Sequence, residues 1–156
     1  MKKVLVILPH GFEDIEAVTV VDILRRGGAR VTLAGTNEGT VEGSRGVKIV
    51  PDCLFDTVSS ADFDLVVLPG GQPGTGNLQK NDKVLAFLRT MHSGGKLVAA
   101  ICAAPLVLQD AGLLQGINAT CHPSVRDKLH SAHYIDERVV VDGRIITSQA
   151  PGTAME

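Results

Sequence analysis

The sequence predicts a three-layer α/β sandwich in which a mostly parallel β-sheet carries helices on both faces. Three aliphatic runs, at 4–8, 65–68 and 97–101, are continuous rather than alternating, which is typical of strands buried on both faces. Amphipathic helical patterns separate these runs, and strands that alternate with helices form parallel sheets through right-handed crossovers. The 156 residues are the size of one domain and can bury a sizeable core, so we expect a single domain over 1–156.

The elements of the first half follow from periodicity and from helix-ending glycines. The first strand covers 3–8 and the second covers 30–34. Apolar residues at helical spacing between them predict an amphipathic helix that ends at Gly27-Gly28. Asn81 is a typical N-cap residue, and we expect it to open another helix, which ends at Gly94-Gly95.

The second half contains a further helix and a hairpin. The helix is expected over 103–111, directly after a strand at 96–101. Near the C-terminus, apolar strands at 138–141 and 144–147 flank Asp142-Gly143, a dipeptide that is a strong signal for a tight β-hairpin. We therefore expect a β-hairpin near the end of the chain.

Charge and composition exclude several classes of partner. Lys and Arg together number 15 and Asp and Glu number 17, so no basic surface for nucleic acid is expected. Aromatic residues make up only 3% of the chain, which argues against a base-stacking surface. No apolar run is long enough to span a bilayer, and the N-terminal apolar stretch is not followed by a cleavage site. We expect a cytoplasmic protein that binds neither nucleic acid nor membrane.

The three cysteines, Cys53, Cys102 and Cys121, are far apart in the sequence and form no C-x-x-C pair. Reduced thiols are therefore expected, and the sequence contains neither a zinc ribbon nor a thioredoxin-type motif. Cys121 with the nearby histidines could suggest a metal site, but their spacing matches no known ligand pattern, so no metal is expected. His130 and His133 are interpreted more simply as surface residues.

Candidate site residues gather at the carboxyl ends of the predicted strands, where ligands bind in doubly wound sheets. Cys102 follows the strand at 96–101 directly and precedes a helix, so we expect it on a sharp strand-to-helix elbow that exposes its side chain. A helix N-terminus favours negative charge, which predicts an acidified thiol, and the N–H groups there can hold an oxyanion. The alternative interpretation is a buried structural cysteine.

A carboxyl group is expected beside this thiol. Glu13, Asp14 and Glu16 follow the first strand, and acids in a first helical turn usually cap the helix or compensate its dipole. Glu16 differs from the other two acids because the apolar face of the helix begins around it, so its carboxyl group is expected to point into the protein. A desolvated Glu16 should have a raised pKa, and its protonated form could donate a hydrogen bond to a thiolate.

Glycines and a histidine at other strand ends are further candidates. Gly70 and Gly71 follow the strand at 64–68 and allow backbone amides to approach a ligand, although this segment taken alone favours a plain glycine turn. His122 follows a strand expected near 117–120 and is a candidate general base or proton shuttle.

Five segments, in order along the chain, together carry a family resemblance. They are Glu13-Asp14-Ile15-Glu16, Val67-Leu68-Pro69-Gly70-Gly71, Val98-Ala99-Ala100-Ile101-Cys102-Ala103-Ala104-Pro105, Cys121-His122-Pro123 and Thr147-Ser148-Gln149-Ala150-Pro151-Gly152-Thr153. These segments resemble the ThiJ/PfpI superfamily, and within it the deglycase and glyoxalase group of the parkinsonism-associated protein and its bacterial relatives. The resemblance covers essentially the whole chain.

The resemblance implies a flavodoxin-like fold, a homodimer and no cofactor. It implies that Cys102 is the reactive elbow cysteine and that Glu16 is its protonated carboxyl partner. Gly71 and Ala103 would supply backbone N–H groups around the sulfur or an oxyanion. His122 would lie nearby, as in glyoxalase-type members.

The resemblance also implies the function. Members of this group are cofactor-independent glyoxalases or deglycases, which act on small dicarbonyls such as methylglyoxal and glyoxal or on their early adducts. The alternative is an oxidative-stress sensor or redox-regulated chaperone that works through oxidation of Cys102. Ala103 stands where the peptidase branch has His, so a protease is not expected. In the family's interface region, Arg26 and Arg45 look like paired arginines.

The C-terminal segment departs from the family pattern. Thr153-Ala154-Met155-Glu156 looks like the opening of a helix that family members continue. We therefore expect the domain to lack the family's C-terminal helix and to expose an apolar face of its sheet.

Overall fold

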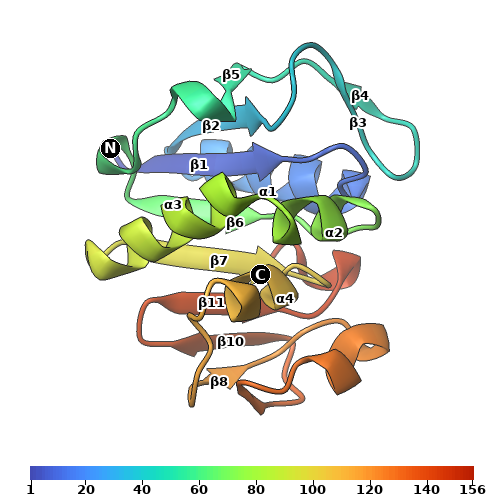
Figure 1. The fold of residues 1–156 in the computed structure, drawn as a ribbon. Coiled ribbons are helices and arrows are strands. Elements are labelled where there is room, and N and C mark those ends of the chain that lie inside the picture. The colour runs from blue at the N-terminus through green and yellow to red at the C-terminus, as the bar shows by residue number, and fades with distance from the viewer.

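A seven-stranded sheet crosses the centre of the molecule (Figure 1). The computed structural model describes all 156 residues. Neighbouring strands are parallel except at the β10–β11 hairpin, which confirms the predicted fold class and the hairpin. From one edge to the other, the strands are β10 (Val139–Asp142), β11 (Ile145–Ser148), β7 (Leu97–Ile101), β6 (Leu65–Leu68), β1 (Lys3–Leu8), β2 (Arg30–Gly35) and β5 (Cys53–Leu54).

Helices pack on both faces of this sheet, with α1 on one face and the other three on the opposite face (Figure 1). The helices are α1 (Asp14–Arg26), α2 (Gly74–Gln79), α3 (Asp82–Ser93) and α4 (Pro105–Asp110). As predicted, Asn81 caps α3, because its side chain accepts hydrogen bonds from N–H groups of the first turn. α4 is shorter than the helix predicted over 103–111, because Pro105, whose missing N–H suits a first turn, opens it.

Shorter elements complete the fold. The strand predicted near 117–120 is reduced to two residues and lies outside the central sheet. The additional strands are β3 (Val41–Glu42), β4 (Lys48–Ile49), β8 (Asn118–Ala119) and β9 (His133–Tyr134), paired as β3–β4 and β8–β9. Short 3-10 helices cover Phe55–Thr57, Ser60–Asp62, Pro123–Lys128 and Pro151–Thr153. None of the helices combines the length and the apolar character needed to cross a membrane.

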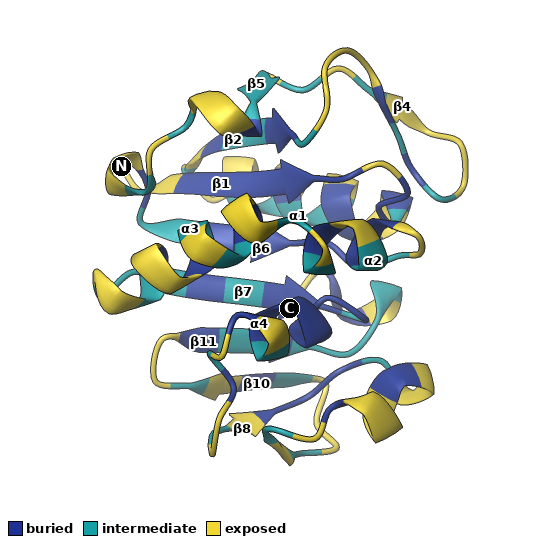
Figure 2. Ribbon diagram, viewed as in Figure 1, coloured by how far each residue is buried: buried dark blue, intermediate teal, exposed yellow.

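The core divides into two parts because β1 faces a helix layer on each side. Leu5 and Ile7 belong to the larger part, with α2, α3 and α4, whereas Val4, Val6 and Leu8 belong to the part beneath α1. This alternation is the two-residue period of a strand, and burial on both faces explains why the strand reads as a continuous aliphatic run. Figure 2 shows the central strands largely buried and the outer surfaces of the helices exposed.

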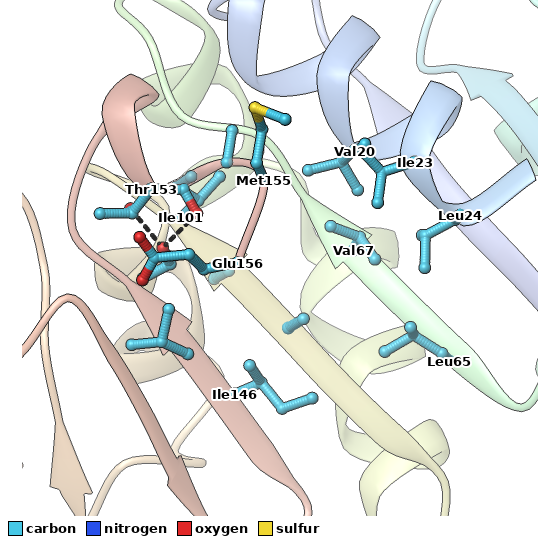
Figure 3. Close-up of a pocket in the computed structure, with 15 residues that line it drawn as sticks. Val20, Ile23, Leu24, Leu65, Val67, Ile101, Ile146, Thr153, Met155 and Glu156 are labelled. Atoms are coloured by element: carbon cyan, nitrogen blue, oxygen red, sulfur yellow. Dashed lines mark hydrogen bonds between the residues drawn. The ribbon is translucent and has the colours of Figure 1, made fainter. Parts of the chain in front are cut away.

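An apolar groove lies on the α1 side of the sheet, where no helix covers β7 and β11. Its volume is about 190 Å³. Figure 3 shows side chains of α1, including Val20 and Ile23, facing Val67 of β6, with Met155 and Glu156 at the rim.

Candidate active site

The carboxyl ends of β1, β6 and β7 lie along one edge of the sheet, and Cys102 follows β7 directly. Its φ of 66° makes it the only non-glycine residue with a positive φ. Two backbone hydrogen bonds hold it: its N–H donates to the Ser148 carbonyl at 2.8 Å, and its carbonyl accepts from the His122 N–H at 2.7 Å. Strained conformations of this kind cost about 1–3 kcal/mol and persist only where the surroundings fix them. The predicted sharp elbow is therefore present.

Glu16 lies in the first turn of α1 and is completely buried. Its Oε2 accepts a hydrogen bond from the Gly70 N–H at 2.7 Å, while its Oε1 has no hydrogen-bond partner. Burial raises the pKa of Glu16 to about 7, although interactions with Cys102 and Gly70 oppose this rise. The carboxyl group can therefore gain or lose a proton near neutral pH, in agreement with the raised pKa expected from the sequence.

Gly70 and Gly71 bring the chain between Glu16 and Cys102. A Cβ atom on Gly70 would lie 2.7 Å from the Cys102 Cβ and 2.8 Å from Glu16 Oε2, so only glycine fits. Gly71 has a φ of 92°, and a Cβ atom there would collide with the backbone of Phe12 and Glu13. The two glycines thus form a tight turn and also permit a close approach to the thiol.

The backbone amides of this turn have different partners. The Gly70 N–H donates to Glu16 Oε2, so this amide is not free to bind the ligand or oxyanion for which Gly70 was a candidate from the sequence. The N–H groups of Ala103 and Gly71 lower the pKa of Cys102 and so favour its thiolate. These two amides are the donors available to a developing negative charge.

The prediction of an acidified thiol is wrong for the state with an ionised Glu16. Burial and the adjacent Glu16 carboxylate raise the pKa of Cys102 to about 12, and the amides of Ala103 and Gly71 only partly offset the increase. The helix N-terminus contributes little because α4 begins at Pro105, beyond the thiol. Protonation of Glu16 removes the charge repulsion and converts the carboxyl group into a donor, so a thiolate here requires a protonated Glu16.

His122 is close to the elbow through its backbone, but its ring has other partners. The Nδ1 atom accepts a hydrogen bond from the Ser124 N–H at 3.1 Å and lies 2.8 Å from Ser124 Oγ. A ring whose Nδ1 accepts this bond carries its proton on Nε2 when neutral, so Nε2 is a donor rather than a base. No hydrogen bond joins the ring to Cys102 or Glu16.

The remaining residues singled out from the sequence lie away from this cluster. Arg26 pairs with Asp22 on α1, with 2.9 Å between Nε and Oδ2, and Arg45 lies in the loop between β3 and β4. His130 and His133 are exposed, as predicted. No group of three His, Cys, Asp or Glu side chains is placed to hold a metal ion, and all three cysteines are free thiols.

Two contributors to the site were missed from the sequence. Ser148, at the end of β11, supplies the carbonyl that holds the Cys102 N–H, and the parallel pairing of β11 with β7 is the signal that could have located it. Asp14 was interpreted as compensating the helix dipole, but it is buried and accepts hydrogen bonds from a distant loop. Nothing in the local sequence distinguishes it from Glu13.

The raised pKa of Glu16 predicts a pH-dependent stability. Because the pKa of Glu16 is higher in the folded than in the unfolded protein, protonation of Glu16 stabilises the folded state. This contribution to the free energy of unfolding is complete below the ordinary pKa of 4.5 and is lost as pH rises through about 7. The variant Glu16→Gln cannot titrate at this position and therefore does not lose this stability. The free energy of unfolding of the variant minus that of the wild type should increase by about 3 kcal/mol between pH 5 and pH 8.5. Urea unfolding of both proteins at the two pH values measures this change. A difference that does not vary with pH would contradict the assignment.

Comparison with known proteins agrees with the motifs. The profile of the DJ-1/PfpI family matches residues 2–156. Protein DJ-1 homolog A of Arabidopsis thaliana is 47% identical over 99% of this chain, which spans 40% of that relative's length. The glutathione-independent glyoxalase DJR-1.2 of Caenorhabditis elegans is 39% identical, with coverage of 99% and 84%. The crystal structure of Drosophila melanogaster DJ-1beta superimposes with a TM-score of 0.95 at 44% identity, over 99% of this chain and 84% of that one. The chain therefore belongs to the DJ-1/PfpI family.

Proposed function

We propose that the protein is a cysteine-dependent glyoxalase that needs neither glutathione nor another cofactor, and that it converts methylglyoxal or glyoxal to the corresponding hydroxy acid. The observation that carries this proposal is the buried carboxyl group of Glu16 beside the Cys102 thiol, with one carboxyl oxygen unpartnered. A nucleophile next to a group that titrates near neutral pH is the arrangement that this chemistry needs. The glyoxalase name of the Caenorhabditis elegans relative supports the same activity.

The first step is addition of the thiolate to the aldehyde carbon. The Cys102 sulfur bonds to that carbon, the carbonyl electrons move to oxygen, and protonation of the oxygen gives a hemithioacetal. The N–H groups of Ala103 and Gly71, which favour a negative charge on Cys102, are the donors that would stabilise this oxyanion. Ionised Glu16 takes the proton that leaves the thiol, which gives the protonated Glu16 that a thiolate requires here. Glu16 then passes this proton to the oxyanion and is ionised again, so no external base is needed.

The second step moves a proton between the two substrate carbons. Ionised Glu16 takes the proton from the former aldehyde carbon, which gives an enediol, and then returns a proton to the neighbouring carbon. The product is a thioester of the hydroxy acid, and water hydrolyses it to release the acid and the thiol. For methylglyoxal the sum is methylglyoxal plus water to lactate, without net oxidation. A pKa of about 7 suits Glu16 for both transfers.

His122 would assist as a donor. Its neutral ring carries the proton on Nε2 because Nδ1 is engaged by Ser124. We assign to it a hydrogen bond to the second carbonyl oxygen of the substrate, and we leave the abstraction of the carbon-bound proton to Glu16. A deglycase would differ in the first step: on an early adduct, the Cys102 thiolate would displace the bound amine or thiol from the former aldehyde carbon, and that leaving group would take up a proton.

Lactate formation tests the proposal directly. We expect the protein to convert methylglyoxal to lactate, followed by proton NMR, in the absence of glutathione and in the presence of a metal chelator. Folded protein that consumes no methylglyoxal above the buffer rate would overturn the proposal. In that case the redox-sensor alternative predicts that dilute peroxide adds two oxygen atoms to Cys102, which peptide mass spectrometry detects.

Two expectations from the sequence stay predictions. A homodimer would be favoured by the exposed apolar residues Ile15 and Val18 on α1 and Val50 after β4. A cytoplasmic location, in which the three cysteines stay reduced, is the other.

A further inference from the structure

Asp14 is the second buried acid at the start of α1, and it faces away from the thiol. Only 6% of its surface is exposed, yet it forms no ion pair. Its two carboxylate oxygens accept hydrogen bonds from the N–H groups of Arg45 at 2.8 Å and Val47 at 2.9 Å. These residues belong to the loop between β3 and β4, about thirty positions along the chain. A buried carboxylate that satisfies two backbone donors fixes the loop and the helix end to each other.

The same loop is bonded to the segment that precedes α1. The Gly11 N–H donates to the Glu42 carbonyl at 2.8 Å, and the Ser44 N–H donates to the Phe12 carbonyl at 2.7 Å. The Ser44 hydroxyl adds a hydrogen bond of 3.1 Å to Glu13 Oε2. The loop also packs tightly, since a Cβ atom on the buried Gly43 would lie 2.6 Å from Asp14 Cγ.

The segment before α1 in turn contacts the active-site turn. The Glu13 N–H donates to the Gly70 carbonyl at 2.8 Å, and the Gly70 N–H donates to Glu16 at 2.7 Å. Asp14 and Glu16 are two positions apart, and residues at this spacing point to different sides of a helix. The first turn of α1 is therefore held from one side by the loop through Asp14 and from the other by Gly70 through Glu16.

We propose that Asp14 is a positioning residue, which acts through the first turn of α1 to hold the Glu16 carboxyl group against Cys102 and away from water. The inference rests on the proposed function only for the role of Glu16 in turnover. A change at Asp14 should loosen the loop, let the helix end move and admit water to Glu16. A displacement of about 1 Å at a catalytic group lowers rates by up to about 100-fold.

Asp14→Asn is the test, because it keeps the shape but replaces one acceptor oxygen by a donor that opposes an N–H group. The readout is the titration of Glu16 in protein labelled with ¹³C at glutamate carboxyls, its signal identified by its loss in Glu16→Gln. The titratable groups that act on Glu16 are Cys102 and Glu13, and both are retained. We expect the titration midpoint, about 7 in the wild type, to fall by about one unit, since better hydration favours the charged form.

Asp22→Asn is the matched control, because Asp22 is an exposed acid on the same helix, bonded only to Arg26. It should leave the midpoint unchanged. In turnover of methylglyoxal, Asp14→Asn should lower kcat between about 10- and 100-fold with little change in KM. An unchanged Glu16 midpoint in folded Asp14→Asn would overturn the proposal.

A milder variant covers the case in which Asp14→Asn does not fold. Ser44→Ala removes only the hydroxyl contact with Glu13, and it should lower the Glu16 midpoint in the same direction by a smaller amount. An unchanged midpoint in this variant would then overturn the proposal. The Glu16 midpoint is measured without substrate, so it tests the role of Asp14 independently of turnover. A wild type that forms no lactate would refute the proposed function, and the titration would still decide the role of Asp14.

Discussion

Cys102→Ser should abolish lactate formation from methylglyoxal while the fold is retained. Serine is close in size, but its hydroxyl group ionises far less readily than a thiol and cannot form the thioester on which turnover depends. Loss of a nucleophile in other enzymes lowers kcat by several orders of magnitude, so we expect a decrease of at least about 1,000-fold in kcat/KM. The rate of methylglyoxal loss in the two proteins measures it, with thermal unfolding as the check on folding.

Cys53→Ser is the control for this substitution. Cys53 lies on β5, at the edge of the sheet, where it pairs with Ala34 of β2 rather than with a strand of the site. It should turn over methylglyoxal at the wild-type rate. Retained turnover in Cys102→Ser, or a comparable loss in Cys53→Ser, would refute the assignment of Cys102 as the nucleophile.

Glu16→Gln should lower kcat by about 100-fold or more, the range found when a general acid or base is removed. Glutamine can still accept the hydrogen bond from Gly70 through its amide oxygen, but it cannot exchange a proton with the substrate. Alkylation by iodoacetamide, in which the Cys102 sulfur displaces iodide from carbon, does not need this proton exchange. We therefore expect iodoacetamide to modify Cys102 in the variant at least as fast as in the wild type at pH 8, because the repulsion from an ionised Glu16 is gone.

The comparison of alkylation with turnover separates two roles of Glu16. If alkylation slows as much as turnover, Glu16 serves mainly to form the thiolate, and the proposed proton transfer is wrong. Glu38→Gln changes an exposed acid after β2 in the same way and should alter neither rate.

Much of the fold could be predicted because its signals are local. Continuous aliphatic runs identify the strands that are buried on both faces, since each such strand packs against a helix layer on each side. Asn81 and Asp142-Gly143 identify a helix start and a hairpin because their backbone preferences depend on few neighbours. The carboxyl ends of parallel strands meet at one edge of a sheet, which is why the sequence could place Cys102 and Glu16 near each other.

The electrostatics of the site could not be predicted, because they depend on tertiary distances. Whether the Cys102 thiol is acidic depends on the charge of Glu16, which sequence separation does not reveal. The Gly70 N–H donates to Glu16, and the Ser124 N–H donates to the His122 ring. These hydrogen bonds also depend on the positions of side chains, which the sequence does not specify. Asp14 was misinterpreted because its partners lie in a loop whose position no local pattern specifies.

The measurement that tests the account most directly is the amount and handedness of the lactate formed from methylglyoxal by the wild type and by Glu16→Gln, analysed side by side on a chiral column. A proton delivered by a carboxyl group that is fixed on one side of a covalently held substrate reaches only one face of the carbon. The account predicts one lactate molecule per methylglyoxal consumed, as a single enantiomer, from the wild type and almost none from the variant. Racemic lactate from the wild type, or equal yields from both proteins, would contradict it.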